Sequence, residues 1–305
     1  MSKNLEIIKS TDNMEQGYIT VSGGKVWYKI VGKNEQDTPL LILHGGPGAS
    51  HTYLEPLEEL AKKRPVIFYD QLGCGNSDRP DDTSLWTIDR FVDELHRVRN
   101  TLGLKKVYIL GQSWGSSLAV EYMLTKQPEG VKSLILSGPL LSTSRWVKDQ
   151  KSYIEELPQE TREIIHQSEQ SGNYDSAKYQ EAMMHFYKLH VCRLDPWPDC
   201  LNKAFSNLNM DLYLHMWGPS EFSVSGTLRN YERVSSLDII DIPVLFTCGE
   251  HDEATPSTTR YYNKNLPGSQ IHILEDASHE HHLEKTEEYL SVVNKFLEEV
   301  ENGKN

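Results

Sequence analysis

The strongest chemical signal in the sequence is a serine between two glycines, Gly111-Gln112-Ser113-Trp114-Gly115. An apolar run precedes this pentapeptide and a helical pattern follows it. A G-x-S-x-G turn between a strand and a helix typically holds the serine hydroxyl exposed for nucleophilic attack. The alternative is a glycine-rich turn whose serine only caps the helix. We predict that Ser113 is the nucleophile of an acyl-transfer reaction.

A serine nucleophile needs a general base, because the pKa of its hydroxyl lies far above 7. Where this turn occurs in an α/β sheet, the acid and the base follow the serine in chain order. Asp252 comes shortly after the apolar run 244–246, and His279 comes shortly after the run 271–274. We therefore predict Asp252 as the acid that orients the imidazole and His279 as the base.

Rival residues lie close to both predicted partners. Glu250 lies too near the strand end to serve as the acid, and Glu253 would point elsewhere if Asp252 faces the imidazole. Two rival histidines are expected at the start of a helix, and a third lies inside a strand and is expected to be structural. These histidines are His281, His282 and His272.

Acyl transfer also needs donors for the negative charge that develops on the carbonyl oxygen. The glycine-rich segment His44-Gly45-Gly46-Pro47-Gly48 follows an apolar run and could bring backbone N–H groups close to a substrate. We predict an oxyanion hole formed by the N–H groups of Gly45 and Trp114. The alternative is a plain connector between a strand and a helix. The segment contains no G-x-G-x-x-G fingerprint and no Walker lysine, which argues against a nucleotide site.

The composition narrows the possible partners. The net charge of −13 disfavours nucleic acid and anionic membranes, since both require basic patches. No apolar stretch is long enough for a membrane span, and the polar start lacks the apolar core of a secretory signal. Four cysteines without a C-x-x-C pair are expected to be reduced thiols. We therefore expect a cytoplasmic protein, and nothing in the sequence fixes its oligomeric state.

The elements that must position these residues follow an α/β pattern. Residues 17–32 form two alternating runs around a Gly-Gly turn, which predicts a β-hairpin. Short apolar runs then alternate with helical patterns, as expected for an open parallel sheet that binds ligands at the carboxyl ends of its strands. The expected strands are 40–43, 66–69, 107–110, 134–136, 244–246 and, more weakly, 271–274.

The alternation of strands and helices stops between residues 139 and 236. This stretch is rich in aromatic residues and carries helical patches without a clear strand. We predict that 139–236 form a mostly helical cap, inserted into a core domain built from 1–138 and 237–305. The expected fold class is thus α/β, with a mostly parallel central sheet, an N-terminal antiparallel hairpin and a helical cap insertion.

Four motifs together resemble the prolyl aminopeptidase (proline iminopeptidase) family of α/β-hydrolases. They are HGGPG at 44–48, DQLGCGNS at 70–77, GQSWG at 111–115 and GEHDEATP at 249–256. The resemblance extends over most of the chain and implies the α/β-hydrolase fold. It also implies release of an N-terminal residue, often proline, from short peptides or amides with a free N-terminus. Ser116 departs from the pattern, because many members have glycine there.

The resemblance further implies two glutamates that hold the substrate amine. The segment 216–222 resembles the stretch that supplies one of them, which maps to Glu221, and the second maps to Glu253. Paired carboxylates suit a partly buried ammonium group, because its charge must be compensated. The alternative is that both are solvated surface carboxylates.

Neither a cofactor nor a metal is required by this chemistry. The segment 190–200 contains His, Cys and Asp, but its spacing matches no common zinc pattern, and a plain cap loop is the simpler interpretation. An amino-acid amidase or a serine esterase could use the same triad, and both remain open alternatives. A non-catalytic relative is disfavoured, because such proteins usually lack one member of the triad and this chain retains all three.

Overall fold

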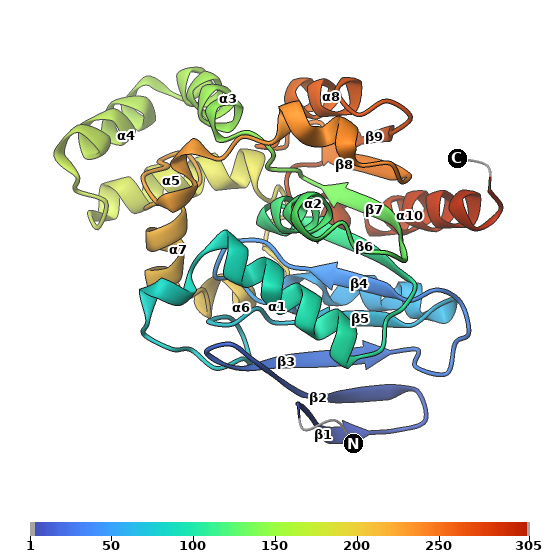
Figure 1. The fold of residues 1–305 in the computed structure, drawn as a ribbon. Helices are drawn as coiled ribbons and strands as arrows, with labels where there is room; N and C mark the ends of the chain where they lie inside the picture. The colour runs from blue at the N-terminus through green and yellow to red at the C-terminus, as the bar shows by residue number, and fades with distance from the viewer. Residues whose placement is uncertain (1–3, 304–305) are drawn as a thin grey trace.

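The computed structural model describes residues 4–303 and is built around a nine-stranded sheet (Figure 1). The strands lie in the order β1-β2-β3-β5-β4-β6-β7-β8-β9. Their bounds are β1 (Leu5–Ser10), β2 (Met14–Val21), β3 (Gly24–Val31), β4 (Leu40–Leu43), β5 (Val66–Tyr69), β6 (Val107–Gln112), β7 (Val131–Ser137), β8 (Val244–Gly249) and β9 (Gln270–Leu274).

The sheet is parallel from β5 to β9 and antiparallel at its N-terminal edge. The hairpin β2–β3 and the six parallel strands confirm the predictions from sequence. Strand β3 joins the parallel part by pairing antiparallel with β5. The edge strand β1 was not predicted. Its residues are mostly exposed, so it lacks the apolar run that marks the buried strands.

Helices cover both faces of the parallel strands, and the alternation of side chains in β4 shows how. Leu41 and Leu43 pack in one cluster with residues of α1 (Ile88–Thr101) and α2 (Trp114–Lys126). Leu40 and Ile42 point to the opposite face, where η1 (His51–Lys62) and α10 (Thr286–Glu301) pack. Burial on both faces explains why the strands read as continuous apolar runs.

The chain between β7 and β8 is helical and has its own apolar cluster. Its helices gather beyond the carboxyl ends of the parallel strands (Figure 1). The predicted division into cap and core at residues 139 and 236 stays a prediction. The chain between β7 and β8 contains α3 (Thr143–Glu156), α4 (Gln159–Ser171), α5 (Ala177–His190), α6 (Asp199–Ser206), α7 (Met210–Met216), η3 (Thr227–Asn230) and η4 (Val234–Ile239).

Three short elements complete the described chain: η2 (Thr83–Leu85), α8 (Pro256–Lys264) and α9 (His281–Glu284). Across residues 4–303, none of the helices combines the length and the apolar character that crossing a bilayer demands.

Truncating a leucine in the packed sheet should cost far more stability than truncating an exposed one. Leu134 in β7 is 0% exposed, whereas Leu214 in α7 is 45% exposed. We expect Leu134→Ala to lower the free energy of unfolding by about 2–5 kcal/mol, because it leaves a cavity between sheet and helices. Leu214→Ala should change it by less than about 0.5 kcal/mol. Urea denaturation measures both, and equal losses would contradict this packing.

Candidate active site

The predicted nucleophile lies in a strained turn between β6 and α2. Ser113 has φ +54° and ψ −121°, a conformation that residues with a side chain rarely adopt. A Cβ atom on Gly111 would lie 2.2 Å from the carbonyl oxygen of Gly115, and one on Gly115 would lie 2.2 Å from that of Leu43. The pentapeptide therefore needs both glycines, because the backbone passes too close to itself and to β4 for any side chain.

Ser116, where many family members have glycine, supports this turn. Its hydroxyl donates to the carbonyl oxygen of Ser113 at 2.6 Å and accepts the N–H of Leu140 at 3.0 Å. The side chain is fully buried. The departure from the family pattern thus adds two hydrogen bonds that tie the turn to the loop after β7.

The predicted acid and base meet at the carboxyl edge of the sheet. Asp252 follows β8 and His279 follows β9, and His279 Nδ1 lies 2.7 Å from Asp252 Oδ1. Asp252 also accepts the backbone N–H groups of Ala254 and Gly249. A Cβ atom on Gly138, at the end of β7, would lie 2.7 Å from the imidazole, so glycine makes room for the ring.

The charge of this pair is fixed by opposing effects. Burial favours neutral Asp252, but the neighbouring imidazolium of His279 outweighs it and holds the pKa of Asp252 well below its usual range. For His279, burial favours the neutral ring, yet the carboxylates of Asp252 and Glu253 prevail and raise its pKa to about 10. Both carboxyl groups therefore favour the protonated form of the ring.

Ser113 and His279 line one small cavity of about 60 Å³ together with Glu221 and Glu253. Nε2 of His279 lies 3.6 Å from Glu253 Oε1. In the part of the chain that the structure describes, no hydrogen bond joins the ring to Ser113. Such bonds are often long in free enzymes and tighten in the substrate complex. The Glu253 carboxyl group explains the missing hydrogen bond, because it attracts Nε2, the nitrogen that would face the Ser113 hydroxyl.

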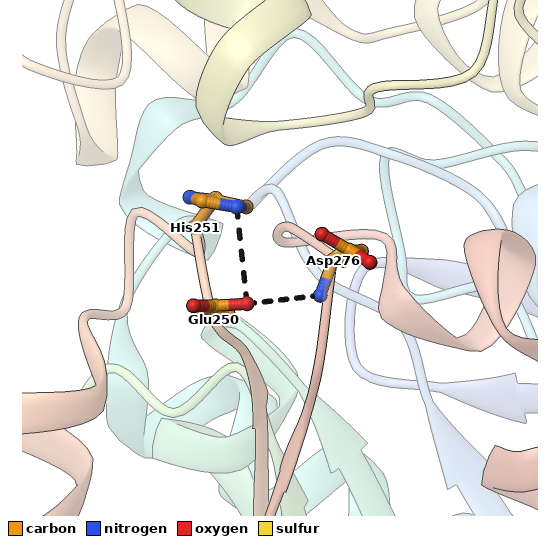
Figure 2. Close-up of side chains that lie close together, drawn as sticks. All are labelled: Glu250, His251 and Asp276. Atoms are coloured by element: carbon orange, nitrogen blue, oxygen red, sulfur yellow. Dashed lines mark hydrogen bonds and ion pairs between the residues drawn. The ribbon is translucent and has the colours of Figure 1, made fainter.

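The rival acid Glu250 faces away from the imidazole. Figure 2 shows its carboxylate in contact with the ring of His251 and with the backbone nitrogen of Asp276. Glu250 Oε2 accepts the Asp276 N–H at 3.1 Å and lies 3.9 Å from His251 Nε2. The three side chains offer possible metal ligands within 4.8 Å of one another, but Glu250 and Asp276 are exposed. These contacts account for the cluster without an ion.

The rival histidines have structural contacts. His281 lies behind Asp252 and contacts the hydroxyls of Ser137 and Thr247 through Nε2. His282 donates to the carbonyl oxygen of Tyr53 at 3.0 Å, and burial lowers its pKa to about 3. His281 starts α9, as predicted. The ring of the third, His272, lies 3.0 Å from the Glu288 carboxylate.

One predicted oxyanion donor needs correction. The N–H of Gly45 already donates to the hydroxyl of Tyr53 at 2.7 Å, and this hydroxyl donates onward to Gln112. Gly45 therefore has no N–H free for a substrate. Its neighbour Gly46 lines the cavity instead. The sequence pattern could not separate the two glycines, because the partner Tyr53 is supplied by η1.

The second predicted donor, Trp114, is the first residue of α2, where helix geometry leaves N–H groups without an intrahelical partner. Its indole Nε1 donates to Gln71 Oε1 at 2.9 Å. Gln71 in turn donates its backbone N–H and its side-chain amide to His44. The DQLGCGNS motif thus connects the nucleophile turn to the HGGPG loop, a role that the sequence did not reveal.

The structure brings the two predicted amine-binding glutamates into this cavity. Glu221 Oε1 accepts the hydroxyl of Tyr213 at 2.7 Å. Glu253 is 1% exposed, and its Oε2 is buried without a hydrogen-bond partner. Burial, reinforced by the charge of Glu221, raises the pKa of Glu253 well above its usual range. A buried carboxyl oxygen without a partner is uncommon in folded proteins and calls for an explanation.

The helical segment also holds both catalytic loops, which sequence reasoning missed. The carbonyl oxygen of His190, at the end of α5, accepts the N–H groups of Glu253 and His279. Its ring stacks on Tyr153 with 3.8 Å between centroids, and Nδ1 donates to the carbonyl oxygen of His251. The loop that carries the acid and the loop that carries the base are therefore tied to one residue.

Comparisons with known proteins agree with this architecture. Residues 38–286 match the family model of the alpha/beta hydrolase fold. The chain is 48% identical over 286 residues to a proline iminopeptidase of Heyndrickxia coagulans, covering 93% of this chain and 99% of the relative. A proline iminopeptidase of Clostridium botulinum is 38% identical, with 92% and 97% covered.

A solved structure of a proline iminopeptidase from Mycobacterium smegmatis superposes with a TM-score of 0.88 at 35% identity. The match covers 95% of this chain and all of that one. Both the sequence and the fold are thus shared over nearly the full length. The chain therefore belongs to the α/β-hydrolase fold family and, within it, to the proline iminopeptidase family.

Proposed function

We propose that the protein is a serine aminopeptidase that releases an N-terminal amino acid, proline foremost, from short peptides or amides. The observation that carries this proposal is the Glu253 carboxyl oxygen, which is buried without a partner in the cavity that Ser113 and His279 line. An ammonium group there would gain two carboxylates, Glu221 and Glu253. A substrate blocked at its N-terminus would leave both carboxylates unpaired in a buried site.

The reaction begins with the proton on His279. The substrate ammonium, placed between Glu221 and Glu253, neutralises the negative charge beside Nε2 and so lowers the pKa of the imidazole, which releases its proton to solvent. The neutral ring accepts the proton of Ser113 as the hydroxyl attacks the carbonyl carbon of the first residue. Asp252 keeps the ring oriented and stabilises the imidazolium that forms.

The tetrahedral intermediate places its negative charge on the former carbonyl oxygen. We infer that the N–H groups of Gly46 and Trp114 hold this oxygen, since Gly45 is engaged with Tyr53. His279 then gives its proton to the leaving amine, and the acyl-enzyme forms on Ser113. Water, activated by the same imidazole, hydrolyses the ester and releases the free amino acid.

Replacing the nucleophile tests the reaction class. We expect Ser113→Ala to lower kcat for prolyl p-nitroanilide by roughly 10⁴-fold or more, because the covalent route is lost. A fluorophosphonate probe should label the parent protein and leave the variant unlabelled, with circular dichroism confirming that both are folded. Labelling that persists in the variant would assign the nucleophile to another residue.

Removing one amine-binding charge should separate aminopeptidase from esterase activity. Glu221→Gln and Glu253→Gln are each expected to lower kcat/KM for prolyl p-nitroanilide by about 100-fold, because the ammonium loses a buried charged partner. Hydrolysis of p-nitrophenyl acetate, which has no ammonium, should not fall, and in Glu253→Gln it should rise at neutral pH because more of the imidazole is neutral. If both substrates lose activity equally, these glutamates support the fold rather than the amine.

The pKa of His279 predicts how the free protein responds to pH. Fluorophosphonate labelling needs the neutral imidazole, so its rate should fall as pH drops below the pKa of His279, about 10. Glu253→Gln removes a negative charge that helps to retain the proton, and should move the labelling midpoint to lower pH. Glu250→Gln, an exposed carboxyl outside the cavity, is the matched control and should leave the midpoint in place. An unchanged midpoint in Glu253→Gln would exclude this coupling.

A further inference from the structure

A third carboxyl, which the mechanism above does not use, lines the substrate cavity. Glu280 directly follows the base His279 and is 5% exposed. Its backbone N–H donates to the carbonyl oxygen of Val191 at 2.8 Å, which fixes its position against the end of α5. Its Oε2 is buried and has no hydrogen-bond partner.

The nearest candidate partner of this oxygen cannot donate to it. His282 Nδ1 lies 3.6 Å from Glu280 Oε2. The other nitrogen, Nε2, faces the carbonyl oxygen of Tyr53 and must therefore carry the proton. Because burial lowers the pKa of His282 to about 3, the ring is neutral and Nδ1 is an acceptor. His282 therefore offers no proton to Glu280, and an ionised Glu280 has to find its donor in the cavity.

Three carboxyls share the wall of this cavity. Its volume is about 60 Å³, and Glu221, Glu253 and Glu280 all contribute to its wall. Burial raises the pKa of Glu280 to about 8 against the opposing charge of His279, so a further bound cation would favour its ionised form.

The number of N–H groups distinguishes two classes of substrate. The secondary ammonium of an N-terminal proline has two N–H donors, which Glu221 and Glu253 can accept. The primary ammonium of any other N-terminal residue has three, and a buried donor left without an acceptor is costly. We propose that Glu280 accepts the third N–H of a primary α-ammonium and thereby extends the specificity of this site beyond proline.

This inference rests on the proposed aminopeptidase function. Three arylamide substrates allow the role of Glu280 and the aminopeptidase function to be tested independently. Alanyl p-nitroanilide has three N–H donors, whereas N-methylalanyl and prolyl p-nitroanilide have two each. Turnover of the prolyl substrate by the parent protein reports on the proposed function. The ratio of kcat/KM for alanyl over N-methylalanyl p-nitroanilide reports on Glu280, because these substrates differ only in the third N–H and its methyl replacement.

We expect Glu280→Gln to lower kcat/KM for alanyl p-nitroanilide about tenfold or more, because a charged hydrogen bond is weakened. The N-methylalanyl and prolyl substrates should change less than about threefold. Glu280→Met keeps the volume and removes both oxygens, so it should lower the alanyl value further. Glu275→Gln is the matched control, an exposed carboxyl in the same loop, and should leave all three values unchanged.

Three results would overturn the inference. The first is an equal loss for all three substrates in Glu280→Gln and Glu280→Met, which would assign Glu280 a purely structural role. The second is an unchanged ratio of alanyl to N-methylalanyl turnover in both variants. The third is a parent protein that hydrolyses the prolyl substrate but not the alanyl one, which would leave the proposed function intact. A parent protein inactive on all three arylamides would instead overturn the proposed function.

Discussion

The active site depends on negative charge held in a buried space next to one imidazole. Asp252 faces Nδ1 of His279, and Glu253 lies close to Nε2. In water these charges would be screened, but burial strengthens every interaction between them. The same charge that would bind a substrate ammonium therefore also keeps the base protonated while the site is free. In the proposed reaction, binding of the substrate and activation of the base would be one event, since the ammonium would replace the imidazolium as partner of the carboxylates.

This arrangement explains the strict geometry of the surrounding fold. Parallel strands deliver Ser113, Asp252 and His279 to one edge, each from the end of a different strand. The sheet alone does not close the cavity. The helical segment contributes Glu221, and the carbonyl oxygen of His190 receives N–H groups from the acid and the base loop. The helical segment therefore contacts both the proposed amine-binding residue Glu221 and the loops that carry Asp252 and His279.

The HGGPG motif alone does not determine which backbone N–H groups form the oxyanion hole. HGGPG indicates a backbone that can approach a substrate, and glycines at 45 and 46 are equally able to do so. The choice between them is made by Tyr53, which comes from η1 and takes up the Gly45 N–H. Glu280 is the converse case, a residue of the cavity wall that no sequence motif marks. It stands in a histidine-rich stretch without any recognisable pattern, and only packing against α5 turns it toward the cavity.

The sequence by itself determined the strands, the strained serine turn and the order of the triad, because these follow from local rules. Apolar runs mark strands buried on both faces, and close backbone contacts demand glycine at 111 and 115. The tertiary structure alone decided which N–H groups are free and how many carboxyls share the cavity. These properties depend on hydrogen bonds and charges between residues far apart in the chain. No local pattern encodes them, since a partner such as Tyr53 or His190 acquires its role only when the chain has folded.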